Sequence, residues 1–123
     1  MAVVTIDTRD KTPIYAQLER GLRAAMATSR LKPGDQLPTV RQLAVELSIN
    51  ANTVARVYAD LERAGAIETR RGVGSFVAAT PDEARPKREH QKRLRAFVTR
   101  VLAEAGHAGF SVDEVVEGLR EEL

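Results

Sequence analysis

Three segments in the first half of the chain repeat their apolar residues at helical spacing, and a helix-breaking sequence follows each. The first predicts a helix that begins at Pro13 and runs to about Ser29, with Asp10 or Thr12 as its N-cap. The turn Pro33-Gly34-Asp35 separates this helix from the next one. These interruptions divide the first half of the chain into separate helices.

The second and third segments are close together. Thr39 is the expected N-cap of a short helix to about Ser48, and Gln42 completes a capping box. The third helix is predicted from Ala51 or Asn52 to Ala64, and Gly65 ends it. Two helices joined by so short a break are typical of a helix-turn-helix.

Two short β-like segments, Ile67–Arg70 and Ser75–Ala78, come next and predict a hairpin. The four residues between them, Arg71-Gly72-Val73-Gly74, supply glycines for the positive φ angles of a tight turn. The order of elements therefore predicts a mainly α fold with a small β-hairpin wing, a winged helix-turn-helix. We expect this domain at 11–79.

A proline-containing linker is expected at 80–86, and a two-helix tail at 87–123. The segment Gly106–Gly109 should break the first tail helix, and a capping box from Ser111 to Glu114 should open the second. Each helix has an apolar face too large to leave in water. These faces could fold back on the winged domain or pair with the same helices of a second chain. We favour pairing and expect a dimerisation tail in which two chains form a four-helix bundle. The expected dimerisation residues are Leu94, Phe97, Val98, Val101, Leu102, Val112, Val115, Val116 and Leu119.

Composition restricts the function classes. With 43% hydrophobic and 29% charged residues, the chain is typical of a globular protein. It has no apolar segment near the roughly 20 residues of a membrane span, and no signal peptide is recognisable, so we expect a cytoplasmic protein without membrane contact. There is no Cys and there are only two His, so we predict no enzyme, no catalytic residues, no metal site and no cofactor.

Charge is distributed unevenly along the chain. Of 19 cationic residues, 15 are Arg. The segment 85–100 is strongly basic, whereas 101–123 is acidic. This asymmetry favours a polyanion partner, although a solvated helix face explains the basic run equally well.

The third helix carries the candidate base-reading residues. If its apolar stripe faces the core, Asn52, Thr53 and Arg56 lie on the opposite face. Arg pairs with guanine and Asn with adenine in the major groove. Asn50 lies at the helix start with Asn52 and Thr53, where free N–H groups can receive a phosphate, and it is a candidate contact. The alternative is that Asn50 serves only as a cap and Thr53 only as a solvated residue.

Six short motifs follow one another over residues 11–79: Pro13-Ile-Tyr-x-Gln-Leu18, Leu31-x-Pro-Gly-Asp-x-Leu-Pro38, Val40-Arg-x-Leu-Ala44, Asn50-x-Asn-Thr-Val54, Tyr58-x-x-Leu-Glu62 and Arg70-Arg-Gly-x-Gly-x-Phe-Val77. In these motifs the segment resembles the DNA-binding domain of the GntR family of bacterial transcription regulators, and the short tail is similar to that of the YtrA-type branch. The resemblance implies that Arg41 contacts DNA, and that Arg70, Arg71 and Gly72 form a wing tip that reaches the minor groove or its phosphates. At positions 51 and 55 this chain has Ala, where other branches of the family have Arg.

We therefore expect a homodimeric, sequence-specific transcription regulator that binds a palindromic operator on double-stranded DNA, with repression as its outcome. The resemblance implies operators with outer GT and AC dinucleotides, control of nearby operons such as those for transporters, and leaves room for a small-molecule effector. An architectural protein that binds DNA with little sequence preference is the alternative. A winged helix that binds only protein is a further one, disfavoured by the basic residues of the wing.

Overall fold

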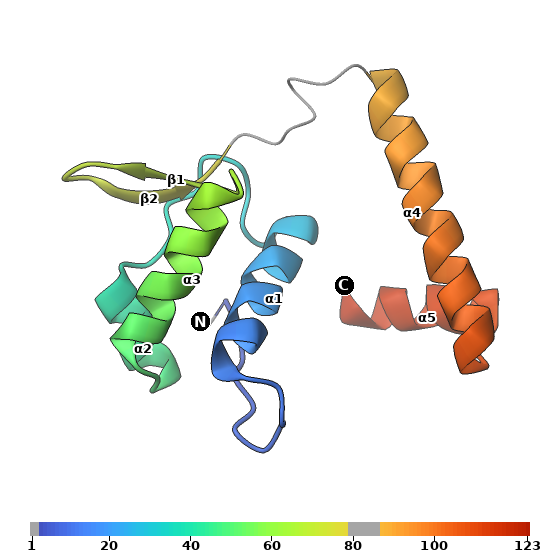
Figure 1. Cartoon of the computed structure of the whole chain (residues 1–123), viewed down its shortest axis with the longest axis horizontal. Helices are drawn as coiled ribbons and strands as arrows, with labels where there is room; N and C mark the ends of the chain where they lie inside the picture. The colour runs from blue at the N-terminus through green and yellow to red at the C-terminus, as the bar shows by residue number, and fades with distance from the viewer. Residues whose placement is uncertain (1–2, 79–86) are drawn as a thin grey trace. The chain divides into compact units, whose positions relative to one another are not determined.

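The computed structural model describes residues 3–78 and 87–123. The chain divides into two units, one up to Thr80 and one from Pro81 onward. The first contains α1, α2, α3 and the strands β1 and β2, and the second contains α4 and α5 (Figure 1). The linker expected at 80–86 and the cation Arg85 lie outside the described residues.

Helix α1 spans Ile14–Ala27, with Pro13 as its N-cap. No side chain caps it, so the expected cap at Asp10 or Thr12 is wrong. The Asp10 carboxylate instead accepts a hydrogen bond from the Thr12 N–H at 2.8 Å, one turn before the helix, and this bond lowers the Asp10 pKa. The helix ends at Ala27 with Thr28 as its C-cap, and Ser29, whose φ is 61°, turns the chain away from the helix.

Helices α2 (Val40–Leu47) and α3 (Ala51–Arg63) form the helix-turn-helix. The capping box predicted at Thr39 and Gln42 is confirmed: the Thr39 hydroxyl accepts from the Gln42 N–H, and the Gln42 side chain accepts from the Thr39 N–H. Ser48 has a left-handed backbone with φ of 56°, which turns the chain sharply between the two helices. Gly65, with φ of 79°, ends α3 as expected.

The wing consists of β1 (Ile67–Arg70) and β2 (Gly74–Val77), which pair antiparallel. The second strand therefore begins and ends one residue earlier than predicted. The loop between α1 and α2 pairs with the free edge of β2: Leu37 N–H donates to Ser75 O, and Val77 N–H to Asp35 O, both at 2.8 Å. This added pairing fixes the base of the wing to the helices, and the hairpin extends away from them (Figure 1).

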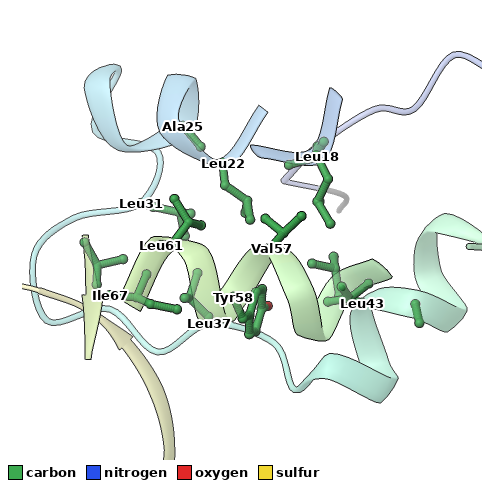
Figure 2. Close-up of a cluster of buried hydrophobic side chains, with 14 residues drawn as sticks. Leu18, Leu22, Ala25, Leu31, Leu37, Leu43, Val57, Tyr58, Leu61 and Ile67 are labelled. Carbon is green, nitrogen blue, oxygen red and sulfur yellow. The ribbon is translucent and has the colours of Figure 1, made fainter. Parts of the chain in front are cut away.

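The core of the first unit lies between the three helices and the base of the wing. Figure 2 shows Leu18 and Leu22 pointing from α1 toward α3. The largest fully buried side chains are Leu18, Leu22, Leu43, Val54, Val57 and Leu61. Burial of each is worth about 1.5–3 kcal/mol, which is why α3 keeps the orientation that leaves its polar residues outside.

The N-terminal segment packs on α1, which the sequence patterns did not predict. Val4 is 3% exposed, and its Cγ1 lies 2.5 Å from where a Cβ on Gly21 would stand. A glycine in mid-helix thus makes room for the segment. Arg30 holds it further by donating from Nη2 to the Val3 carbonyl at 2.9 Å.

The second unit contains α4 (Lys87–Ala108) and α5 (Val112–Glu122). The helix breaks within the expected segment Gly106–Gly109, but only at its end: α4 continues through Gly106 to Ala108, and Gly109 follows with φ of 88°. A glycine inside a helix, such as Gly106, lowers helix stability by only about 1 kcal/mol relative to alanine and does not end the helix. Gly109 does end it, because its positive φ is incompatible with an α-helix. The capping box of Ser111 and Glu114 is confirmed. No helix in the described parts of the chain is both long and apolar enough to cross a membrane.

Candidate nucleic-acid interface

Helix α3 separates its apolar and polar residues cleanly. Val54, Val57, Tyr58 and Leu61 are buried. Asn52 and Arg56 are exposed, and Thr53 is half-buried. Ala51 and Ala55 are also exposed, so the helix presents two polar side chains flanked by small residues. Such a surface can approach base edges closely, since alanine adds little bulk.

Asn50 is the N-cap of α3. Its Oδ1 accepts a hydrogen bond from the Asn52 N–H at 2.8 Å, and its main-chain carbonyl accepts from the Thr53 N–H at 3.0 Å. Two of the N–H groups that we expected to be free for a phosphate therefore have partners within the protein. The Asn50 amide NH₂ has no partner among the described residues and remains a donor at the start of the helix.

The Arg56 guanidinium does not extend freely from α3. It lies over the Tyr15 ring of α1, with its central carbon 4.3 Å from the ring centroid. No role for Tyr15 could be predicted from the sequence, because the contact joins two helices that no local pattern relates.

Arg41 occupies the second position of α2 and is exposed. The ion pair with Glu46 or Glu62 that would explain it as a surface residue does not form in the structure; Glu62 instead accepts from the Thr69 hydroxyl at 3.1 Å. Arg41 has no partner among the described residues. Its charge is therefore available to an external anion.

Tyr58 fixes the start of α2 against α3. Its hydroxyl donates to the Pro38 carbonyl at 2.8 Å, directly before the Thr39 capping box. Burial, and to a smaller extent the Glu46 carboxylate, raises the pKa of Tyr58 to about 12. The phenol thus keeps its proton and its hydrogen bond at neutral pH, and α2 stays in place beside α3.

The two wing arginines differ. Arg70, at the end of β1, stacks over the Phe76 ring with its central carbon 4.3 Å from the centroid. Arg71 lies in the turn, is exposed and has no partner among the described residues. Gly72 has φ of 76°, as the tight turn was expected to need, and a Cβ there would meet nothing within 4 Å. The wing therefore presents one free cation at its turn and a second one braced on an aromatic ring.

Together these residues place basic and amide side chains on α2, α3 and the wing of one unit. Within the described residues, no group of three or more His, Asp or Glu side chains could hold a metal ion. The basic residues Arg88, Lys92, Arg93, Arg95 and Arg100 belong to the other unit, on α4, and are exposed.

Comparison with known proteins agrees with this arrangement. The family model described as bacterial regulatory proteins, gntR family, matches residues 14–77. The HTH-type transcriptional repressor YtrA of Bacillus subtilis (strain 168) is 32% identical over 119 residues, covering 97% of this chain and 91% of that protein. The similarity thus extends through the tail.

Solved structures show the same likeness. YtrA from Sulfolobus acidocaldarius, a GntR-family transcription factor, is 33% identical with a TM-score of 0.61, over 82% of this chain and 98% of that one. The N-terminal domain of AraR, solved in complex with a mutant of its operator ORR3, is 26% identical with a TM-score of 0.51, over 54% of this chain and 94% of that one. This chain therefore belongs to the GntR family of bacterial regulatory proteins, in its YtrA-type branch, and is a DNA-binding transcription regulator rather than an enzyme.

Proposed function

We propose that this regulator is a homodimer that binds a palindromic operator in the cytoplasm and represses transcription from it. The observation that carries the proposal is the exposed polar face of α3, where the side chains of Asn52 and Arg56 form no hydrogen bond or ion pair with any of the described residues. Two relatives support it: YtrA of Bacillus subtilis is named a repressor, and AraR was solved with an operator.

In this proposal residues 11–79 are the DNA-binding domain, and α3 enters the major groove. Arg56 reads a guanine and Asn52 an adenine, since these are the bases with which each side chain can form two hydrogen bonds. Thr53 and the amide of Asn50 contact the same site from the start of the helix.

The remaining candidate residues contact the DNA backbone on either side of the bases that α3 reads. Arg41 at the start of α2 neutralises a phosphate, because no carboxylate in the described part of the chain competes for it. The wing brings Arg70, Arg71 and Gly72 to the minor groove or its phosphates. Arg71 is the principal wing contact, since it lies in the turn itself and is exposed, whereas Arg70 lies at the end of β1 over the Phe76 ring.

Residues 87–123 form the dimerisation tail. The exposed residues at the expected dimerisation positions are Leu94, Phe97, Val98, Leu102, Val112, Val116 and Leu119, and Val101 and Val115 are half-buried. Helix α5 leaves the end of α4 at a steep angle (Figure 1), so the two helices do not cover each other as a packed hairpin would. Apolar faces of this size are unstable in water and are typical of a protein interface.

The distribution of charge between α4 and α5 supports a second copy of this chain as the partner of the tail. The first half of α4 is basic, whereas α5 has Asp113, Glu114, Glu117, Glu121 and Glu122. In a symmetric dimer, the basic segment of each chain can lie against the acidic helix of the other chain, so this contact between opposite charges forms twice. Two linked winged domains then bind two half-sites about one helical turn apart.

Selection of DNA sequences by the purified full-length protein, followed by competition with random duplex at two salt concentrations, tests the proposal. We expect the selected palindrome to bind about 10³-fold or more tightly than random DNA. Equal affinities would indicate the architectural alternative, and no binding would indicate a protein partner. Sedimentation of the free protein tests the dimer.

The role of α3 has its own test. Asn52→Ala should weaken operator binding by about 1–3 kcal/mol and random binding much less. The matched control is Arg63→Ala at the other end of α3, where the side chain is already paired with Asp60. Equal losses on both DNAs for Asn52→Ala would contradict base reading.

A further inference from the structure

The stack of Arg56 on Tyr15 joins the base-reading helix to α1. Tyr15 is in the first turn of α1, and Arg56 is in the middle of α3. Their separation of 4.3 Å is well within the roughly 6 Å at which an aromatic face attracts a cation. Tyr15 is 38% exposed, so the contact lies at the surface of the winged unit and not in its core.

The contact with Tyr15 leaves the N–H donors of Arg56 without a hydrogen-bond acceptor among the described residues. A guanidinium stacked on a ring uses its flat face, whereas its five N–H donors lie in the plane of the group. Within the described residues Arg56 donates no hydrogen bond and pairs with no carboxylate. Tyr15 therefore restrains the side chain without using the donors that a base would need.

Such restraint matters because arginine is long and flexible. An unrestrained side chain loses rotamer freedom when it orders on a ligand, and this loss weakens binding. Recognition of guanine O6 and N7 needs both donors in one plane at a fixed position. A side chain that is already held near that position loses less rotamer freedom when it binds the base, so binding is less weakened by this loss.

We propose that Tyr15 is a positioning residue for base recognition, whose ring holds the Arg56 guanidinium ready for a guanine in the major groove. This inference rests on the proposed function, because it requires α3 to read bases. It assigns specificity to a residue of α1, outside the helix-turn-helix and the wing.

Two substitutions separate the ring from the other properties of the side chain. Tyr15→Phe keeps the ring and removes the hydroxyl. Tyr15→Leu keeps apolar bulk and removes the ring. A contact of the hydroxyl with a phosphate would make both variants equally defective, whereas the stack predicts that only Tyr15→Leu is defective.

The measurement is the ratio of affinities of the full-length protein for its selected operator and for random duplex at one salt concentration. We expect Tyr15→Leu to lower this ratio about two- to fivefold, as the loss of an exposed cation–π pair should, and Tyr15→Phe to preserve it. In an Arg56→Ala background, Tyr15→Leu should have no further effect, because the two residues act as one unit.

A readout without DNA tests the stack itself. The Arg56 Hε resonance should be shifted upfield by the ring current in the wild type and in Tyr15→Phe, and should lose that shift in Tyr15→Leu. The proposal is overturned if Tyr15→Leu keeps the wild-type affinity ratio, or if Tyr15→Phe lowers the ratio as much as Tyr15→Leu does. It is also overturned if Tyr15→Leu lowers the ratio further in the Arg56→Ala background. A wild-type protein that does not prefer its operator would instead show that the proposed function is wrong.

Discussion

Gln36 donates a hydrogen bond from Nε2 to the main-chain carbonyl of Val73, at 3.1 Å, and so ties the loop between α1 and α2 to the turn of the wing. The same nitrogen lies 2.6 Å from the place where a Cβ on Gly74 would stand. Gly74 has φ of 140°, so both its backbone and this close approach favour glycine. The wing is thus oriented by a side chain of the loop as well as by the backbone pairing of β2.

Gln36→Ala should therefore loosen the turn that presents Arg71. We expect weaker binding to operator and random DNA alike, by about 0.5–1.5 kcal/mol, which is the usual net worth of one hydrogen bond. Competition binding measures both affinities. Gln91→Ala, at an exposed glutamine of α4, is the control and should bind as the wild type does. Unchanged affinities for Gln36→Ala would show that the wing keeps its orientation without this bond.

Arg71→Ala should weaken binding to every DNA sequence and lower the slope of log affinity against log salt by about one. The reason is that its charge has no partner among the described residues and is free for a phosphate. Arg23→Ala removes the same charge from α1, where it is paired with Glu19 at 3.3 Å, and should change the slope less. A slope and affinity unchanged in Arg71→Ala would leave Arg71 as a surface residue only.

Asn50 combines two functions that substitution can separate. Asn50→Ala should cost about 1 kcal/mol of folding stability through loss of the N-cap, measured by urea denaturation. Asn50→Ser keeps a capping oxygen but has no amide NH₂, so it should preserve stability and lose about 0.5–1.5 kcal/mol of operator affinity. Wild-type operator affinity in Asn50→Ser would mean that Asn50 is only a cap.

Ser48, between α2 and α3, has a left-handed backbone with φ of 56°. A residue with a Cβ is strained there and glycine is not, although glycine loses more entropy on folding. Ser48→Gly should therefore raise the free energy of unfolding by about 0.5–1 kcal/mol in urea denaturation. The control is Ser75→Gly in β2, where φ is not positive, and it should destabilise the protein. Equal effects of the two substitutions would exclude backbone strain as the cause.

Features governed by neighbouring residues could be predicted from the sequence. The capping boxes at Thr39 and Ser111 and the helix stop at Gly65 each depend on side chains or backbone angles within a few positions. The boundaries of α2 and α3 follow from the same local signals. The helix-turn-helix was therefore placed correctly before any tertiary contact was known.

Contacts between distant segments could not be predicted in this way. The stack of Arg56 on Tyr15, the bond from Gln36 to Val73 and the packing of Val4 on Gly21 each join elements that no periodicity relates. They arise only once the core has fixed α1, α3 and the wing. The sequence thus identified Arg56 as a polar residue of α3, and the structure alone revealed what holds it.

Dimerisation should depend on the apolar face of α4, and DNA affinity on dimerisation. Phe97 is 55% exposed in the single chain, so Phe97→Asp should leave α4 folded while placing a charge where burial would be worth about 1.5–3 kcal/mol. Sedimentation should report a monomer, and affinity for a palindromic probe should fall about 10²–10⁴-fold as the linkage of two modules is lost. Ala103→Asp, at an exposed position on the opposite side of α4, is the control and should remain dimeric. A Phe97→Asp protein that stays dimeric would assign this face another role.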